Sequence, residues 1–199
     1  SNIQTQIDNA GGASNVTGLS DALVENNSVY IGNDPSSTTS NAYYNVAVGT
    51  TALDAITTGD QNTAVGYNAL SSNTSGNYNT ALGSALYSNT SGNYNTALGN
   101  ATLHYNTTGN YNTAVGSESL NSNTTGIRNT ASGYAALSQN TSGYYNTASG
   151  YQAGDVITTG SNNVILGYAA DPSANNASNQ IVIGKGATGQ GDNYAVIGN

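Results

Sequence analysis

Short apolar clusters, each closed by a glycine, recur along the chain at a nearly constant spacing. The motif Asn-Thr-Ala-x-Gly stands at Asn62–Gly66 and returns five times, and related clusters extend the pattern: NSVYIG and YNVAVG before it, and NNVILG, NQIVIG and YAVIG after it, as far as Gly198. A fixed short period, here about 17 residues, indicates a repeat architecture in which every repeat is one structural unit. The predicted corner glycines are Gly49, Gly66, Gly83, Gly99, Gly116, Gly133, Gly150, Gly167 and Gly184.

Within each cluster the side chains alternate with a period of two, which predicts a short β-strand. In most repeats, Thr, Val or Ile stands three residues before the glycine, and Val, Leu, Ile or Ser stands one residue before it. Between them lies an almost invariant alanine, from Ala47 to Ala148. Because the two outer columns carry the β-branched and aliphatic residues, we expect them to face the interior of the coil and the alanine to face outward.

A second segment follows each glycine and predicts a second short strand. It contains a small residue and Leu, as in Ala69–Leu70, and continues into Asn-Thr-[Thr/Ser]-Gly, which predicts a second glycine corner. Ile56 and Ile157 replace the asparagine in two repeats, which indicates a buried position. Asparagines stacked in register can satisfy one another's amides along the axis of a solenoid. The predicted buried ladder comprises Asn73, Asn89, Asn106, Asn123 and Asn140.

These elements predict an all-β fold, a parallel β-roll or β-solenoid of about ten coils with about 16–17 residues each. Coils about 4.8 Å apart would make a rod roughly 48 Å long. We assign the roll to residues 28–199. Residues 1–27 do not fit the repeat, and we expect a connector or cap there, with a short helix that could start at Ser20 and Asp21. Because the chain has no Met, we expect it to be a fragment of a longer protein.

The composition favours a thin folded core and excludes several classes of function. The 199 residues include 25 Gly and 15 Tyr but no Phe, Trp, Cys or Met. The net charge is −8, and Arg128 and Lys185 are the only Arg and Lys. Two cations cannot form the basic patch that nucleic acid or an anionic membrane surface requires. No apolar run is long enough to insert into a bilayer.

No group of residues predicts catalysis or a cofactor. His104 is the single histidine, and most other repeats hold Ser, Asp or Asn at its position. Glu118 and Asp155 each stand alone in their coils. Calcium-binding rolls repeat an acid in their turns, whereas the Asn-Thr-[Thr/Ser]-Gly turn has none. We therefore expect no enzyme activity, no catalytic residues, no metal site and no cofactor.

Two further columns bear on binding. Tyrosines recur five residues before the glycine; such a surface stripe could stack on sugars or, as we favour, form a ladder that stabilises the roll. The Thr column from Thr63 to Thr147 would suit ice binding if it faced outward, but its exchange with Val46 and Val164 argues that it faces inward. The tyrosines of the stripe are Tyr78, Tyr94, Tyr111 and Tyr145.

The clusters NSVYIG at Asn27–Gly32, YNVAVG, NNVILG and NQIVIG resemble the head repeat of trimeric autotransporter adhesins, the YadA-like head. The resemblance covers about residues 27–198. It implies a left-handed parallel β-roll and the assembly of three chains around a common axis. This chain departs from the family in its longer period and in the Thr that its central coils carry where the family has Val.

The stretches LSDALVENNSVYIGNDPSSTT and GATGQGDNYAVIGN also resemble fibre proteins of marine bacteriophages, in which such rolls form part of a trimeric tail-fibre shaft or receptor-binding segment. The resemblance implies a virion or cell-surface location. We expect a structural and attachment protein, a segment of a homotrimeric fibre whose outside partner would be a cell-surface glycan or protein receptor. A bacterial adhesin head and an ice-binding solenoid are the alternatives.

Physical chemistry favours an oligomer independently of any resemblance. With so few large apolar residues, one roll buries little surface to set against the entropy lost on ordering. A flat alanine column would let a neighbouring chain approach closely. We therefore expect three rolls to pack through the alanine column.

Overall fold

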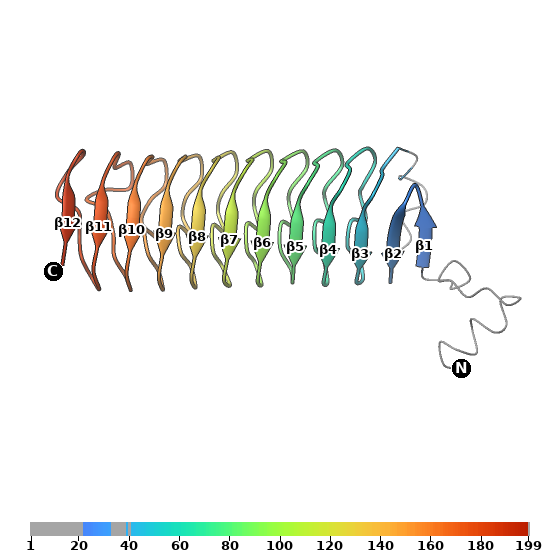
Figure 1. Ribbon diagram of the computed structural model, residues 1–199, viewed down its shortest axis with the longest axis horizontal. Coiled ribbons are helices and arrows are strands. Elements are labelled where there is room, and N and C mark those ends of the chain that lie inside the picture. The colour runs from blue at the N-terminus through green and yellow to red at the C-terminus, as the bar shows by residue number, and fades with distance from the viewer. Residues whose placement is uncertain (1–21, 33–38, 40, 199) are drawn as a thin grey trace, which may run out of the picture.

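The computed structural model describes residues 22–32, 39 and 41–198, which form one rod of stacked coils (Figure 1). Within these residues, twelve strands make a single sheet in chain order, and β2 to β12 pair in parallel. Neighbouring strands are in register, so that Ala64 pairs with Ala81 and Ala81 with Ala97. The predicted parallel β-solenoid of about ten coils is confirmed. The strands are β1 (Ala22–Glu25), β2 (Ser28–Ile31), β3 (Val46–Val48), β4 (Thr63–Val65), β5 (Thr80–Leu82), β6 (Thr96–Leu98), β7 (Thr113–Val115), β8 (Thr130–Ser132), β9 (Thr147–Ser149), β10 (Val164–Leu166), β11 (Ile181–Ile183) and β12 (Ala195–Ile197).

The first strand closes the N-terminal end of the sheet. β1 pairs antiparallel with β2 through a turn at Asn26 and Asn27, which both have positive φ. The short helix expected in the connector is therefore wrong for Ala22–Glu25, while residues 1–21 lie outside the described part of the chain. An antiparallel strand covers the hydrogen-bonding edge that a solenoid would otherwise expose.

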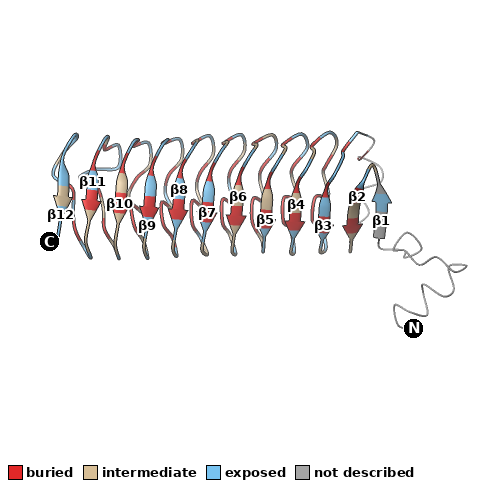
Figure 2. Cartoon of the chain, in the orientation of Figure 1, coloured by how far each residue is buried: buried red, intermediate tan, exposed pale blue. Residues whose placement is uncertain are grey.

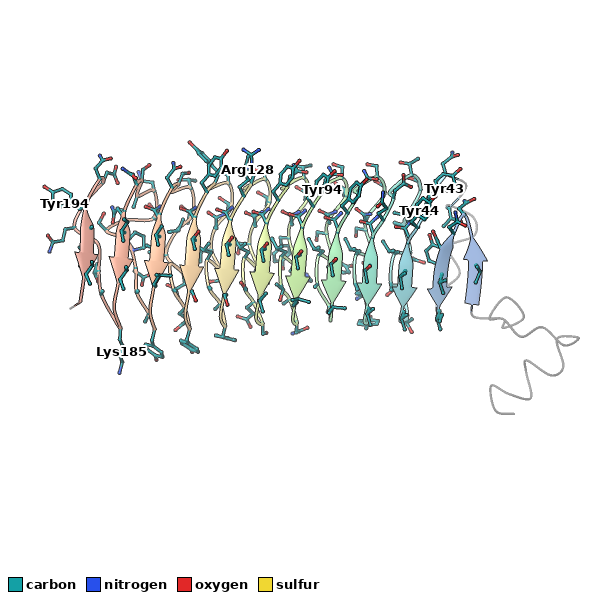
Figure 3. All side chains as sticks on the ribbon, in the orientation of Figure 1. Tyr43, Tyr44, Tyr94, Arg128, Lys185 and Tyr194 are labelled. Carbon is teal, nitrogen blue, oxygen red and sulfur yellow. The ribbon has the colours of Figure 1, made fainter. Side chains whose placement is uncertain are left out.

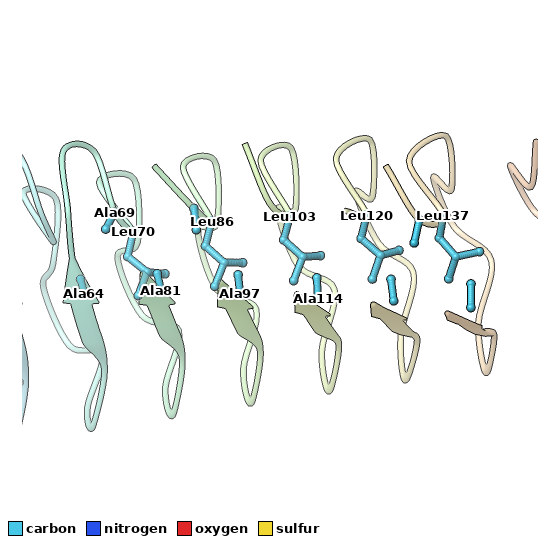
Figure 4. Packing of buried hydrophobic residues seen from close by; sticks show 14 of the residues in the cluster. Ala64, Ala69, Leu70, Ala81, Leu86, Ala97, Leu103, Ala114, Leu120 and Leu137 are labelled. Atoms are coloured by element: carbon cyan, nitrogen blue, oxygen red, sulfur yellow. The ribbon is translucent and has the colours of Figure 1, made fainter. Parts of the chain in front are cut away.

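In the strands, the alanine column faces the interior of the coil, and the two flanking columns face outward. Ala64 is fully buried, whereas Thr63 is half-buried and Val65 is exposed, and the other coils repeat this pattern (Figure 2). The prediction that the Thr and aliphatic columns face the interior and the alanine faces outward is wrong. Leu70, Leu86 and their equivalents reach across the coil toward the strand and fill the interior (Figure 4). The strand can therefore contribute little more than a methyl group.

The buried residue of the strand has a larger side chain where the leucine opposite to it is missing. Gly154 takes the leucine position in its coil, and the Ala column then holds Ile165, whose Cγ1 would lie 3.6 Å from a Cβ placed on Gly154. At the N-terminal end, the fully buried Tyr30 occupies the same column next to Ala47. This exchange of size keeps the interior close-packed along the rod.

The second segment of each coil is a turn and not the short strand that we expected. Its leucines adopt the left-handed conformation, as in Leu53 (φ 54°) and Leu103 (φ 50°). Its backbone still bonds between coils, as in the Leu103 N–H donated to the Ser119 carbonyl at 3.0 Å. Because left-handed residues interrupt the pleat, each coil has one strand, and a compact turn layer covers its inner face.

Candidate interaction surface

Both glycine corners bring consecutive coils so close that no side chain fits between them. Among the predicted corner glycines, Gly133 has φ 135°, and a Cβ on it would lie 2.3 Å from the Gly150 carbonyl oxygen. At the second corner, a Cβ on Gly109 would lie 2.3 Å from Asn106 Oδ1 and 2.5 Å from the Gly126 carbonyl oxygen. The first corner therefore needs glycine for conformation and for space, and the second for space alone.

The five asparagines predicted to form a ladder are fully buried and linked along the rod. Each of the last four donates its Nδ2 to the Oδ1 of the preceding one at 2.7–2.8 Å. Each of the five also donates to the carbonyl of the second corner glycine in its own coil, as Asn123 does to Gly126 at 3.1 Å. Ile56 and Ile157 stand at the two ends, and Asn140 Oδ1, the last acceptor, has no partner. We call this column the corner ladder.

A second buried ladder, which was not predicted from the sequence, stands immediately before the strands. In a typical member, Asn112, the backbone N–H and Nδ2 both donate to Asn95 Oδ1, at 3.0 and 3.2 Å, and Nδ2 also donates to the Gly126 carbonyl at 2.8 Å. The two ladders therefore share the second corner glycine. The sequence did hold a sign of this ladder, because eight consecutive repeats keep the asparagine without exception. The strand ladder comprises Asn45, Asn62, Asn79, Asn95, Asn112, Asn129, Asn146 and Asn163.

The predicted tyrosine stripe is a continuous stack along one long edge of the strands (Figure 3). The rings of Tyr78, Tyr94 and Tyr111 lie nearly parallel, with centroids 4.7 and 5.0 Å apart. The Arg128 guanidinium then lies between the rings of Tyr111 and Tyr145, 5.5 and 5.3 Å from their centroids. Neighbouring rings cover one another's faces, so the stack presents ring edges and hydroxyls to solvent. Within the stack, no ring face is therefore open for a sugar to stack on.

A second stack borders the other end of the strands, where Figure 3 labels Lys185. The rings of Tyr134, Tyr151 and Tyr168 follow one another at 5.2 and 5.1 Å, and Lys185 Nζ lies 5.7 Å from the Tyr168 centroid. Each of the two cations of the chain is therefore a member of an aromatic stack, where cation–π attraction replaces ring stacking.

Replacing Tyr94 by Asn is expected to lower the free energy of unfolding by about 1–2 kcal/mol, because two stacking contacts are lost. Asn suits the left-handed backbone of this column, which holds Asn162 and Asn179 in later coils. Chemical denaturation measures the loss, and near-UV circular dichroism should report the broken stack. The matched control is Tyr67→Asn, which alters a tyrosine of the other column that lies outside both stacks described above. Equal losses in the two variants would contradict a stabilising role for the stack.

Between the two stacks lies a flat surface made by the outward side chains of β3 to β12, which we call the strand face. It has no charged residue, and its aliphatic members include Val65, Leu82, Val115 and Ile181, each 37–42% exposed. Parallel pairing in register repeats the pattern about every 4.8 Å. The strand face comprises Val46, Val48, Thr63, Val65, Thr80, Leu82, Thr96, Leu98, Thr113, Val115, Thr130, Ser132, Thr147, Ser149, Val164, Leu166, Ile181, Ile183, Ala195 and Ile197.

The titratable side chains of the rod are dispersed. His104 stacks on Tyr87 at 5.0 Å and meets Tyr105 edge-on at 4.7 Å, and burial lowers its pKa. Within the described residues, no group of three or more His, Asp or Glu could hold a metal ion. No helix in that part of the chain is long and apolar enough to cross a membrane. Burial, and then the neighbouring charge of Asp155, raise the pKa of Asp171 to about 6.

Acidification is expected to stabilise the coils around Asp171. The folded pKa of about 6 exceeds the ordinary value of 3.8, so the folded chain binds this proton more tightly than the unfolded chain. The contribution is complete below about pH 3.8 and is lost as the pH rises through about 6. Solvent screening of the half-buried carboxyl limits it to about 1 kcal/mol. Urea midpoints should therefore rise from pH 7 to pH 5, and Asp171→Asn should remove more of that rise than Asp54→Asn; equal effects would contradict this assignment.

Comparisons of the chain with protein-family models, with curated protein sequences and with solved structures gave no significant match. The strand face, its two tyrosine stacks and the buried ladders are therefore interpreted from their own geometry.

Proposed function

We propose that the chain is a shaft segment of a homotrimeric fibre that attaches to a cell surface, as in a bacteriophage tail fibre, and that three rods pack through their strand faces. The observation that carries the proposal is the strand face itself, an uncharged surface on which most strands expose an aliphatic side chain to water. Large exposed apolar surfaces of this kind mark interaction sites. The alanine column, which we first expected at the interface, lies inside the coil.

The charge distribution favours further copies of this chain as the occupants. A net charge of −8 makes two copies repel one another over most of their surface. The acids Asp60, Glu118, Asp155 and Asp171 all lie outside the strands, and the strand face contributes no charge. It is thus the surface through which two copies can approach without burying a carboxylate. Because the coil spacing is identical in every copy, each level can meet the same level of its neighbour.

The size of the surface also suits an interface. Ten strands of three residues cover roughly 480 Å² at about 4.8 Å between strands and about 3.3 Å per residue. The tyrosine stacks border this area along part of the rod. Specific interfaces bury about 800 Å² on each partner, and the strand face alone supplies more than half of that area.

Light scattering of the purified chain at micromolar concentration tests the proposal. We expect three times the chain mass of 20.0 kDa, and a value that persists on dilution. The mass of a single chain would overturn the trimer. A bacterial adhesin head would have the same mass as the fibre segment; in the parent gene, a C-terminal membrane-anchor barrel would indicate the adhesin and neighbouring virion genes the fibre.

Ice binding is a second candidate, and the orientation of the strands favours it more than the sequence did. Six threonines from Thr63 to Thr147 lie in register on the outward face of consecutive strands. The objection that this column faces inward is therefore removed. Ice and a partner chain would need the same surface, so thermal hysteresis from a 20.0 kDa monomer would select ice binding. A trimer without hysteresis would exclude it.

A further inference from the structure

The strand face is not uniform along the rod. From β3 to β7 the position before the corner glycine is Val or Leu, and from β10 onward it is Leu or Ile. In β8 and β9 the same position holds Ser132 and Ser149, with Thr130 and Thr147 on the same face. These two consecutive strands therefore present hydroxyl groups where their neighbours present aliphatic side chains. We call them the serine levels.

A rod built from nearly identical coils has a difficulty when it packs on copies of itself. From β4 to β7 every level carries a Thr and a Val or Leu, in register with the next. If one chain slides by one coil, about 4.8 Å, these levels meet equivalent partners and lose almost nothing. A pattern that repeats without variation leaves register weakly specified.

We propose that the serine levels fix the axial register of the three chains, an inference that rests on the proposed trimer. In register, the hydroxyls of Ser132 and Ser149 from three copies converge at their own levels, where they can bond to one another or to enclosed water. The small side chains leave room for that water, which needs two or more polar partners.

A slip by one coil removes half of this match, because one serine level still meets a serine level while the other meets an aliphatic one. Ser132 would then meet the Val115 level, or Ser149 the Leu166 level, since these pairs are neighbours in the sheet. A hydroxyl buried against aliphatic side chains loses its hydrogen bonds to water without gaining a replacement. A single polar residue in the apolar seam of a coiled coil fixes register in the same way and lowers stability. The serine levels therefore lower the apolar contact between the chains and, in return, specify their axial register.

The test compares register with and without the serine levels by disulfide trapping. The chain has no Cys, so single Val65→Cys and Leu82→Cys reporters, placed on adjacent strands β4 and β5, give the only thiols. The two reporter chains, distinguished by a mass tag, are refolded together and oxidised. Same-level pairs are favoured in register. The mixed pair between positions 65 and 82 then carries an additional axial offset of about 4.8 Å, which a slip of one coil removes, and disulfides span Cα atoms only about 4.4–6.8 Å apart.

In the natural background, same-level disulfides should dominate. Adding Ser132→Val and Ser149→Val should preserve the trimer, raise its thermal midpoint and increase the mixed disulfide at least fivefold. The control is Ser122→Val with Ser138→Val, the same chemical change outside the strand face, which should leave the mixed fraction unchanged. A trimer whose mixed fraction stays at the natural level without the serine levels would overturn this inference and leave the fibre proposal standing. A natural chain that scatters as a monomer of 20.0 kDa would overturn both.

Discussion

Replacing Asn112 by alanine is expected to lower the free energy of unfolding by about 4–6 kcal/mol. The change removes an Oδ1 that accepts the backbone N–H and Nδ2 of Asn129, at 3.0 and 3.2 Å, and leaves that buried N–H without a partner. It also removes the bonds from Nδ2 to Asn95 and Gly126. An orphaned buried donor costs about 1–3 kcal/mol and each further bond contributes about 1 kcal/mol. Denaturant unfolding followed by far-UV circular dichroism measures the loss.

The matched control is Asn110→Ala, two residues earlier in the same coil. Asn110 Oδ1 also accepts a backbone N–H and an Nδ2, those of Asn93, at 2.8 and 3.1 Å. Because Asn110 is only half-buried, water can replace its bonds, and a loss below about 1 kcal/mol is expected. Losses of equal size in the two variants would mean that burial does not set the strength of the strand ladder.

The period and the corner residues made the fold predictable. The nearly constant spacing between glycines indicates that each repeat forms one coil. Because the glycines keep the same position in every repeat, the coils are expected to stack in register. The replacement of asparagine by Ile56 and Ile157 indicated burial, and the corner ladder lies where that exchange places it. The exchange of a polar for an apolar residue at one position of the repeat therefore indicates burial even within a single sequence.

The direction of the strand was not predictable from apolar character alone. Shifting a strand by one position exchanges its two faces, and we expected the larger side chains inside. In a coil this narrow the Leu70 column already fills the interior, so only the Ala64 column fits against it. The informative signal was the variation between Val115 and Ser132, one coil apart on the same column. A column that accepts both Val and Ser is a surface column.

The turn layer escaped prediction for a different reason. Leucine favours neither turns nor positive φ, yet Leu53, Leu103 and their equivalents adopt φ of 50–54°. Left-handed backbone costs about 1–2 kcal/mol for a residue with a side chain, and burial of a Leu side chain offsets it by about 1.5–3 kcal/mol. Local propensity is thus overruled by packing that exists only when the coils stack.

Replacing Val115 by Asp is expected to dissociate the proposed trimer while leaving the rod folded. Val115 is 40% exposed at the centre of the strand face, so the isolated chain can keep the carboxylate in water. In the trimer three carboxylates would converge at one level. No cation could pair with them there, because Arg128 and Lys185 are held in the tyrosine stacks. Burying an unpaired charge costs about 3–5 kcal/mol, which weakens association at least 100-fold. Light scattering should report the single-chain mass of 20.0 kDa in place of three times that mass, with the far-UV spectrum unchanged.

Two controls separate charge from other effects. Ser138→Asp adds the same charge outside the strand face, in the column that already holds Asp54 and Asp155, and should leave the mass at three chains. Val115→Asn has nearly the size of the aspartate without its charge, and should weaken the trimer less, because a neutral amide can share hydrogen bonds with the neighbouring copies. If Val115→Asp remains a trimer of natural stability, three chains must meet through some surface other than the strand face. If Ser138→Asp dissociates the trimer as strongly, the added net charge rather than its place on the strand face is responsible.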